Sequence, residues 1–408
     1  MQAETVLPRR AEAPTQALQP RALATLLVAG HAVKHIYNSG FFLILPEIAR
    51  ALSLSNTSVG FLNTARSFAG SGSNLPAGFL ADRFSNRWGL ILGMAMITIG
   101  VFQFIMGSLD MYWSIVICAM VVSAATSFWH PAAIAALSLH FSARRGFAIS
   151  LHGSGGSIGE AVGPVLVGAF LGILTWQSIV KISLVPAVLM GALVWFLMRG
   201  TTGPSGSSAT LRAYASGLLA FMRNRQLALI FLSVGGFSMA QAAVNTFLPI
   251  YLRNELDYEP LVAGGYLFLG QVAGIVSAPL MGHLSDRFSR RAVLVPSLVF
   301  LGAGVAALSA VPPGPALLAS VVWIGAFMFP LTSLFIAAAM DRIGATMQAT
   351  AVSLVFGIGT LFASFSPTIA GVLADAFGVQ AAFHWGAAIA LVAAILMAIA
   401  SSTRVKVS

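Results

Sequence analysis

Long apolar runs alternate with short polar tracts along almost the whole chain. Each run holds about the 20 residues that a helix needs to cross a hydrocarbon layer of about 30 Å. Six runs fall on each side of a central polar segment. The pattern predicts an all-α membrane protein with twelve transmembrane helices, at about 22–46, 57–81, 88–109, 112–140, 146–174, 177–199, 227–252, 261–284, 292–311, 315–340, 346–374 and 380–402.

The polar segments predict where the two bundles begin and end. Residues 1–20 contain three prolines and lack an apolar core or a small-residue cleavage site, so we expect a disordered cytoplasmic tail and no signal peptide. Residues 200–226 are rich in Gly, Ser and Thr, which is typical of a linker. The expected domains are therefore bundles at 21–199 and 227–402, with a second short tail at 403–408.

An internal repeat supports this division into halves. The pattern Gly-x-x-x-Asp-Arg-x-x-x-Arg occurs at 78–87 and again 204 residues later at 282–291. An apolar chain with a repeat of half its own length is typical of a membrane transporter built from two similar bundles. The charged positions of the pattern are Asp82, Arg83, Arg87, Asp286, Arg287 and Arg291.

Composition and charge favour a lipid environment. With 58% apolar and 8% charged residues, a soluble domain would expose large apolar patches. The net charge of +10 comes from scattered basic residues in short tracts, so we expect no nucleic-acid partner. The single cysteine, Cys118, excludes a disulfide framework and a cysteine-based metal site.

The basic residues also predict the orientation. If the N-terminus lies in the cytoplasm, the tails, the even-numbered loops and the linker carry 17 of the 22 Lys and Arg residues. The opposite loops carry only Arg50 and Arg253. By the positive-inside rule, both termini are therefore expected to be cytoplasmic.

Several motifs resemble those of a known family. The repeated tract resembles the loop signature of the major facilitator superfamily, and the six-plus-six layout covers nearly the whole chain. The tract around Gly163 and Pro164 is similar to the Gly-Pro signature of proton-coupled exporters in that family, although Ser150 and Val167 stand where glycines are usual. Residues 31–35 and 128–131 look like the corresponding tracts of the fosmidomycin-resistance type of drug exporter. The resemblance implies a proton-coupled antiporter for drug efflux in a bacterial inner membrane.

Two groups of these residues are candidates for gating. Asp82 and Asp286 lie at helix ends, where a carboxylate can bind a neighbouring helix terminus and Arg87 or Arg291, and so latch one gate. The alternative is that they are ordinary loop charges. Gly163 allows close helix approach and Pro164 bends its helix, either for coupling or for packing alone.

Charged side chains deep in predicted helices indicate a binding cavity, because such charges are costly in lipid. They lie almost entirely in the first half, and positions 31, 34, 35 and 38 share one helix face. The second half offers neutral hydrogen-bonding groups at matching depth. The candidate substrate-binding residues are His31, Lys34, His35, Asn38, Arg66, His130, Gln241, Asn245 and Gln271.

This lopsided charge predicts an anionic, or partly anionic, small organic substrate. Glu160 is the carboxylate at comparable depth and is the leading proton carrier, followed by His31 and His130. His152 can simply bind a backbone carbonyl. A second hypothesis is a site for a transition-metal ion, or export of its chelate, on the His/Glu cluster, although Lys34 and Arg66 would repel a cation.

Other functions fit less well. The glycine-rich run at 153–159 lacks the Gly-Lys-Ser/Thr ending of a phosphate loop, so we expect neither an enzyme nor ATP use, and no cofactor. The expected partners are the substrate, protons and the bilayer, with the protein as a monomer. A receptor or scaffold that does not transport remains as a third hypothesis.

Overall fold

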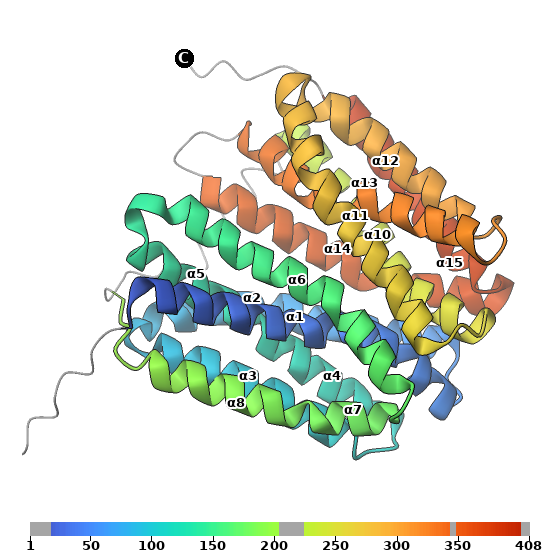
Figure 1. Ribbon diagram of the computed structural model, residues 1–408. Coiled ribbons are helices and arrows are strands. Elements are labelled where there is room, and N and C mark those ends of the chain that lie inside the picture. Colours follow the sequence, from blue (N-terminus) through green and yellow to red (C-terminus); the bar gives the residue numbers. More distant parts are fainter. Residues whose placement is uncertain (1–17, 204–223, 343–347, 401–408) are drawn as a thin grey trace, which may run out of the picture.

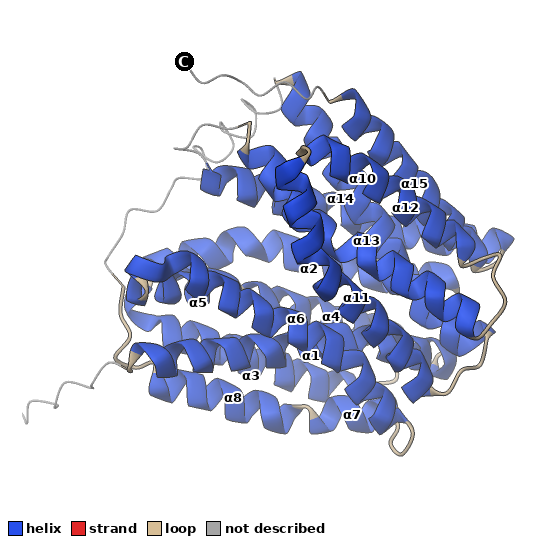
Figure 2. Ribbon diagram, turned by 45° about the horizontal axis from the view of Figure 1, so that its top comes forward, coloured by secondary structure: helices blue, strands red, loops and turns tan. Residues whose placement is uncertain are grey.

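The computed structural model describes residues 18–203, 224–342 and 348–400, and these residues form helices and loops without any strand (Figures 1 and 2). The predicted tail at 403–408 and most of the predicted tail at 1–20 and of the linker lie outside the described residues. The first half contains α1 (Pro20–Ala51), α2 (Asn56–Arg83), α3 (Trp88–Met106), α4 (Tyr112–Ser127), α5 (Trp129–His140), α6 (Arg145–Leu171), α7 (Trp176–Ile182) and α8 (Leu184–Leu197).

The second half begins after the linker. Its elements are α10 (Arg225–Ile250), a π-helical turn η3 (Tyr251–Glu255), α11 (Pro260–Arg287), α12 (Arg290–Ala307), α13 (Pro315–Met340), α14 (Gln348–Phe377) and α15 (Gln380–Ile399). Figure 1 shows the two halves as separate helical bundles that lie side by side.

Two predicted helices are broken. The predicted helix 112–140 divides into α4 and α5 at Phe128, and 177–199 divides into α7 and α8 at Ser183. A proline lies at the third position of each new helix, Pro131 in α5 and Pro186 in α8. Proline has no N–H for the carbonyl four residues earlier and crowds it. Each segment nevertheless has the length and apolar character of one predicted span, at Tyr112–His140 and Trp176–Leu197.

Among the described residues, ten segments are long and apolar enough to cross a membrane by length and composition. They correspond to ten of the twelve predicted spans. The other two, α1 and α2, are 32 and 28 residues long but fall outside this group. Both helices carry polar side chains along their length, so their crossing of the membrane stays a prediction.

The bundles meet mainly through two helix pairs, α2 with α14 and α6 with α11. Their close contacts lie at one end of the molecule, which carries residues 47–57 and 253–264 and is called here the contact end. The opposite end, which carries residues 84–87 and 200–203, is called the linker end. There the backbone N–H of Gly203 donates to the Ser85 carbonyl, at 3.0 Å.

Glycines permit the close contacts of both pairs. Gly371 of α14 lies against the Asn56 carbonyl of α2, and Gly168 of α6 lies against the Pro260 carbonyl of α11. Neither position has room for a methyl group. These contacts are related by the repeat, since 168 and 371 are equivalent positions in the two halves.

Candidate functional site

Glycines of α6 bring the polar residues of α1 together with those of α6. A methyl group on Gly156 would lie 2.7 Å from His31 Cε1, and one on Gly159 would lie 2.8 Å from His35 Cβ. Gly163 leaves room for Ser39 in the same way, and Pro164 lies at the seam with α11, where its carbonyl faces Gly264. Each glycine replaces side-chain volume with space for the facing helix. The seam thereby positions the histidines of α1 against α6.

A chain of hydrogen bonds and one ion-pair contact runs along this seam. His31 Nδ1 lies 2.7 Å from the backbone oxygen of His152, and His31 Nε2 lies 3.0 Å from His35 Nε2. His35 Nδ1 lies 2.9 Å from Glu160 Oε1. From the other bundle, Gln271 Nε2 donates to Glu160 Oε2 at 3.3 Å. The chain therefore connects α1, α6 and α11.

Donor and acceptor rules locate the mobile proton of this chain. A carbonyl oxygen only accepts, so His31 Nδ1 must donate to it. With His31 neutral, its Nε2 accepts and His35 Nε2 donates. His35 Nδ1 and Glu160 then share one further proton, which makes them either an imidazolium and a carboxylate or a neutral pair.

Lys34 lies beside this chain and is almost fully buried. Its side chain is 3% exposed, and its Nζ lies 2.8 Å from His130 Nε2. An ammonium group only donates, so His130 Nε2 accepts. Among the described residues, no carboxylate lies within salt-bridge distance of Lys34.

Arg66 of α2 forms a second buried positive site. Its guanidinium binds the side-chain and backbone oxygens of Asn38 and the side-chain oxygen of Asn63. The same group lies over the Phe41 ring, 4.7 Å from its centroid. In the described part of the chain, its partners are neutral oxygens and aromatic rings, with no carboxylate at ion-pair distance.

The structure places the predicted residues of the second half at different distances from this cluster. Gln271 is buried and binds Glu160 directly. Gln241 lines a separate cavity of about 160 Å³ within the second bundle, together with Phe237 and Phe335. Asn245 is half-buried one helical turn further along α10. The structure therefore brings Gln271, but not Gln241, to the charged cluster.

Sequence reasoning missed Asn63 as a residue of the site and did not predict how His152 packs. His152 stacks on His31 with ring centroids 3.8 Å apart and planes 6° apart. Asn63 joins Arg66 to the other bundle, because its Nδ2 donates to Thr246 Oγ1 at 2.7 Å. The spacing of Asn63 three residues before Arg66 was a usable signal for a shared helix face.

The stacking bears on the metal hypothesis. Ligand atoms of His31, His130 and His152 all lie within 4.8 Å of one another. A metal ion must lie near the plane of each imidazole, along the lone pair of the nitrogen. Two nearly parallel rings 3.8 Å apart cannot both meet this condition, and Lys34 already binds His130. This arrangement does not fit a metal site.

The predicted latch residues differ between the halves. Asp286 pairs with Arg290, not with Arg291, and Arg290 Nε also lies 3.0 Å from Asp341 Oδ2 at the end of α13. Asp82 is exposed and forms no ion pair with any residue that the structure describes. The neighbouring arginines Arg83 and Arg287 lie over Phe84 and Phe288, and Arg87 is exposed.

Polar contacts join the bundles at the contact end. Arg253, in the π-helical turn η3, binds Glu47 of α1 at 2.7 and 2.8 Å. Asp375 of α14 accepts from the backbone N–H groups of Asn56 and Thr57 at 2.8 and 2.9 Å, and from Thr57 Oγ1 at 2.6 Å. Asp375 therefore caps the N-terminus of α2 from the other bundle.

Two helical bundles that meet at one end, with buried charges between transmembrane helices, define a multi-pass membrane transporter. The chain belongs to the Major Facilitator Superfamily, whose family model matches residues 27–367 and again 271–407. It is therefore a transporter and not an enzyme, and its partners are a small-molecule substrate and the lipid bilayer.

Curated relatives are similar over most of the chain. An uncharacterized MFS-type transporter YfnC of Bacillus subtilis (strain 168) is 23% identical over 86% of this chain and 87% of its own. The fosmidomycin resistance protein of Escherichia coli (strain K12) is 23% identical over 72% of this chain and 70% of its own. The puromycin resistance protein pur8 of Streptomyces alboniger is 25% identical over 66% and 63%. The predicted resemblance to a drug-resistance transporter is confirmed.

Solved structures share the fold. A variant of the nucleoside transporter NupG has a TM-score of 0.80 at 12% identity, over 92% of this chain and 99% of the other. A bacterial homolog to the human lysosomal transporter Spinster, in an inward-facing and unoccupied conformation, has a TM-score of 0.75 at 14% identity, over 94% and 95%. At these identities the likeness concerns the fold alone.

Proposed function

We propose that this protein is a proton-coupled exporter of a small anionic organic compound or drug. It acts by alternating access as a monomer in a bacterial inner membrane, with both termini in the cytoplasm. The observation that carries this proposal is the imbalance of buried charge. Lys34 and Arg66 are 3% and 7% exposed and lack a carboxylate partner in the described chain, so an anion is the missing counter-charge.

The proton shared by His35 and Glu160 supports the proposed coupling to protons. Glu160 retains a third of its side-chain surface exposed, at 34%, although it lies midway along α6. It can therefore exchange a proton with water at this exposed surface. Ionised Glu160 accepts more strongly from Gln271 than neutral Glu160 does, so its protonation changes the link between the bundles.

The gates of this cycle lie at the two ends. The contact end is closed in this structure by Glu47, Arg253 and Asp375. In the proposed orientation this is the external gate. Asp82 has no ion-pair partner here among the described residues, which suits a latch that forms only when the linker end closes. Asp286 retains its partner Arg290 within the second bundle.

Export, as opposed to import, is supported by the Gly163-Pro164 tract and by similarity to two resistance proteins. The printed names of those relatives concern fosmidomycin and puromycin. For this chain we propose the chemical class, a compound that carries a carboxylate, phosphonate or phosphate group. Arg66 offers a planar guanidinium for such groups, and Lys34 offers a point charge.

A binding test distinguishes an anion from a metal. Lys34→Ala and Arg66→Ala should each weaken binding of a phosphonate or organic acid by roughly 10- to 100-fold, because a hydrogen bond to a charged group contributes about 1.5–3 kcal/mol. Binding is measured by calorimetry on the purified transporter against a panel of phosphonates, organic acids, lipophilic cations and divalent metals. Arg199→Ala, which changes an exposed arginine at the linker end, is the matched control.

Two outcomes would count against the proposal. Unchanged anion binding in both variants would remove the buried cations from the site. Tight divalent-metal binding that is retained or strengthened in both variants would favour the metal hypothesis, because loss of a neighbouring positive charge helps a bound cation.

A further inference from the structure

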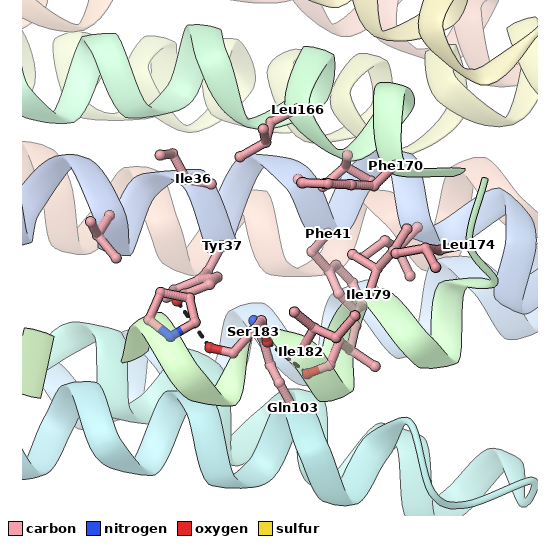
Figure 3. Close-up of a pocket in the computed structure, with 16 residues that line it drawn as sticks. Ile36, Tyr37, Phe41, Gln103, Leu166, Phe170, Leu174, Ile179, Ile182 and Ser183 are labelled. Carbon is pink, nitrogen blue, oxygen red and sulfur yellow. Dashed lines mark hydrogen bonds between the residues drawn. The ribbon is translucent and has the colours of Figure 1, made fainter. Parts of the chain in front are cut away.

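A second cavity lies on the opposite face of α1 from the histidines. It has a volume of about 310 Å³ and lies between α1, α6 and the broken pair α7 and α8, with α3 below (Figure 3). Ile36 and Phe41 of α1, Phe170 of α6 and Ile179 of α7 point into it. The cavity is therefore separate from the site that contains Lys34 and Glu160.

The few polar groups of this cavity already bind one another. Tyr37 Oη donates to the Ser183 carbonyl at 3.1 Å, at the break between α7 and α8. Ser183 Oγ lies within hydrogen-bond reach of Gln103 Oε1 and of the Val180 carbonyl. Apart from the Gln103 amide nitrogen, the polar side-chain groups of the lining are therefore engaged with one another or with backbone carbonyls. The walls suit a hydrocarbon chain and not a polar drug.

The mouth of the cavity opens toward the surrounding lipid. Among its lining residues, Leu166 and Phe170 of α6 are 39% and 42% exposed, and Ile182 of α7 is 56% exposed. Large apolar side chains exposed on membrane-spanning helices face hydrocarbon tails. The bilayer itself is thus the source of chains at this opening.

A cation lies next to the cavity, toward the contact end. Lys181 lies between two lining residues, Val180 and Ile182, and its stem packs near Gly107 at the end of α3. No carboxylate of the described chain lies within salt-bridge distance of it. A lysine at this position can extend its ammonium group to the membrane surface, where lipid phosphates lie.

We propose that this cavity binds one acyl chain of a phospholipid from the leaflet at the contact end, with the lipid phosphate held by Lys181. The cavity and the cation together recognise both parts of the lipid. Because the chain would bridge α1, α6 and α7, the bound lipid acts as part of the first bundle. The proposal does not depend on the identity of the transported substrate.

Photo-crosslinking tests this assignment. The full chain is reconstituted in nanodiscs with phosphatidylglycerol that carries a diazirine on one acyl chain, and labelled peptides are mapped by mass spectrometry. We expect concentrated labelling of residues 166–182. Ile179→Trp, which fills the cavity, and Leu166→Trp, which blocks its mouth, should each abolish this labelling. Val185→Trp adds the same ring on the lipid-facing side of α8, outside the cavity, and should leave it unchanged.

The headgroup is tested separately. Lys181→Ala should lower labelling by phosphatidylglycerol about fivefold, the effect of one basic residue near a membrane surface, and should not alter labelling by the matching diacylglycerol. Two tryptophan variants, Ile179→Trp and Leu166→Trp, are used so that the test still stands if one of them misfolds. The folding of each is checked by size-exclusion chromatography. Equal labelling in all variants would show general contact with surrounding lipid and overturn the proposal. Insensitivity to Lys181→Ala would overturn the assignment to a phospholipid.

Discussion

At the scale of single residues, the protonation of Glu160 affects contacts to both bundles. Glu160 lies between His35 of its own bundle and Gln271 of the other. No other side chain of the described site links a histidine chain directly to the opposite bundle. A change of its charge therefore acts at once on the site and on the bundle interface.

Glu160→Gln should abolish pH-driven accumulation of substrate. The amide keeps the size of the side chain but cannot carry a proton, so downhill exchange should stay measurable. Transport is measured in proteoliposomes with an imposed pH gradient. The control, Glu259→Gln, changes an exposed carboxylate at the start of α11. Full proton-driven transport in Glu160→Gln would assign coupling to a histidine or to another ion.

Gly156→Ala should disrupt the histidine chain. Its new methyl group would lie 2.7 Å from His31 Cε1, whereas at Gly153 nothing lies within 4 Å. Alanine favours a helix over glycine by roughly 1 kcal/mol, so Gly153→Ala should be neutral or stabilising. Thermal unfolding and transport are measured for both variants. Equal behaviour of the two would show that the α1–α6 contact does not position the histidines.

Much of the site was predictable at this scale, because the sequence gives the depth of each residue in its predicted span and the helix face on which it lies. The shared face of His31, Lys34 and His35 is such a case. The partners were less predictable, since they depend on how far one helix slides along another. The close approach at Gly156 sets the position of α1 along α6, and this position brings the His152 carbonyl within hydrogen-bond distance of His31 Nδ1.

At the scale of elements, the two seams between the bundles are similar but not equivalent. Both use glycines against carbonyls, at Gly371 and at Gly168. Only the α2–α14 seam has a carboxylate at a helix N-terminus among the described residues, from Asp375. The equivalent position in the first half is Gly172, which has no side chain. The α2–α14 seam therefore closes more firmly.

Asp375→Asn should favour opening of the contact end. The amide is a weaker acceptor for the α2 N-terminus, and a charge there contributes typically 0.3–1 kcal/mol, or up to about fivefold in the open population. Distances between spin labels across the contact end report this population. Asp110→Asn, in an exposed loop at the same end, is the control. An unchanged distance distribution would remove Asp375 from the gate.

At this scale, neither hydropathy nor the positions of the prolines predict the helix breaks at Phe128 and Ser183. Apolar character continues across Phe128 and Ser183, so hydropathy predicts one helix in each segment. Proline alone does not decide the matter, because Pro46 and Pro330 lie inside unbroken helices. Near the second break, the Tyr37 hydroxyl donates to the Ser183 carbonyl, next to the Ile182 carbonyl that Pro186 leaves without its helical donor.

At the scale of the whole molecule, the repeat and the charge pattern predicted two bundles, and the structure agrees with this division (Figure 1). The conformation was not predictable, because each half is compatible with contact at either end. Here the polar contacts between the bundles favour the contact end, through Arg253 and Asp375. Which side of the membrane that end faces is set by charge.

The positive-inside rule predicts that the contact end is external. Its loops carry only Arg50 and Arg253, and both arginines form ion pairs there, with Asp257 and Glu47. The linker end carries most of the basic residues, including Arg144 and Arg145. A reporter enzyme fused within 204–223 or after Ser408 should therefore be active only in the cytoplasm, and one inserted in 253–259 only outside. As a control, each site also receives a second reporter that is active only in the opposite compartment. External activity at the linker would reverse the orientation and therefore the assignment of both gates.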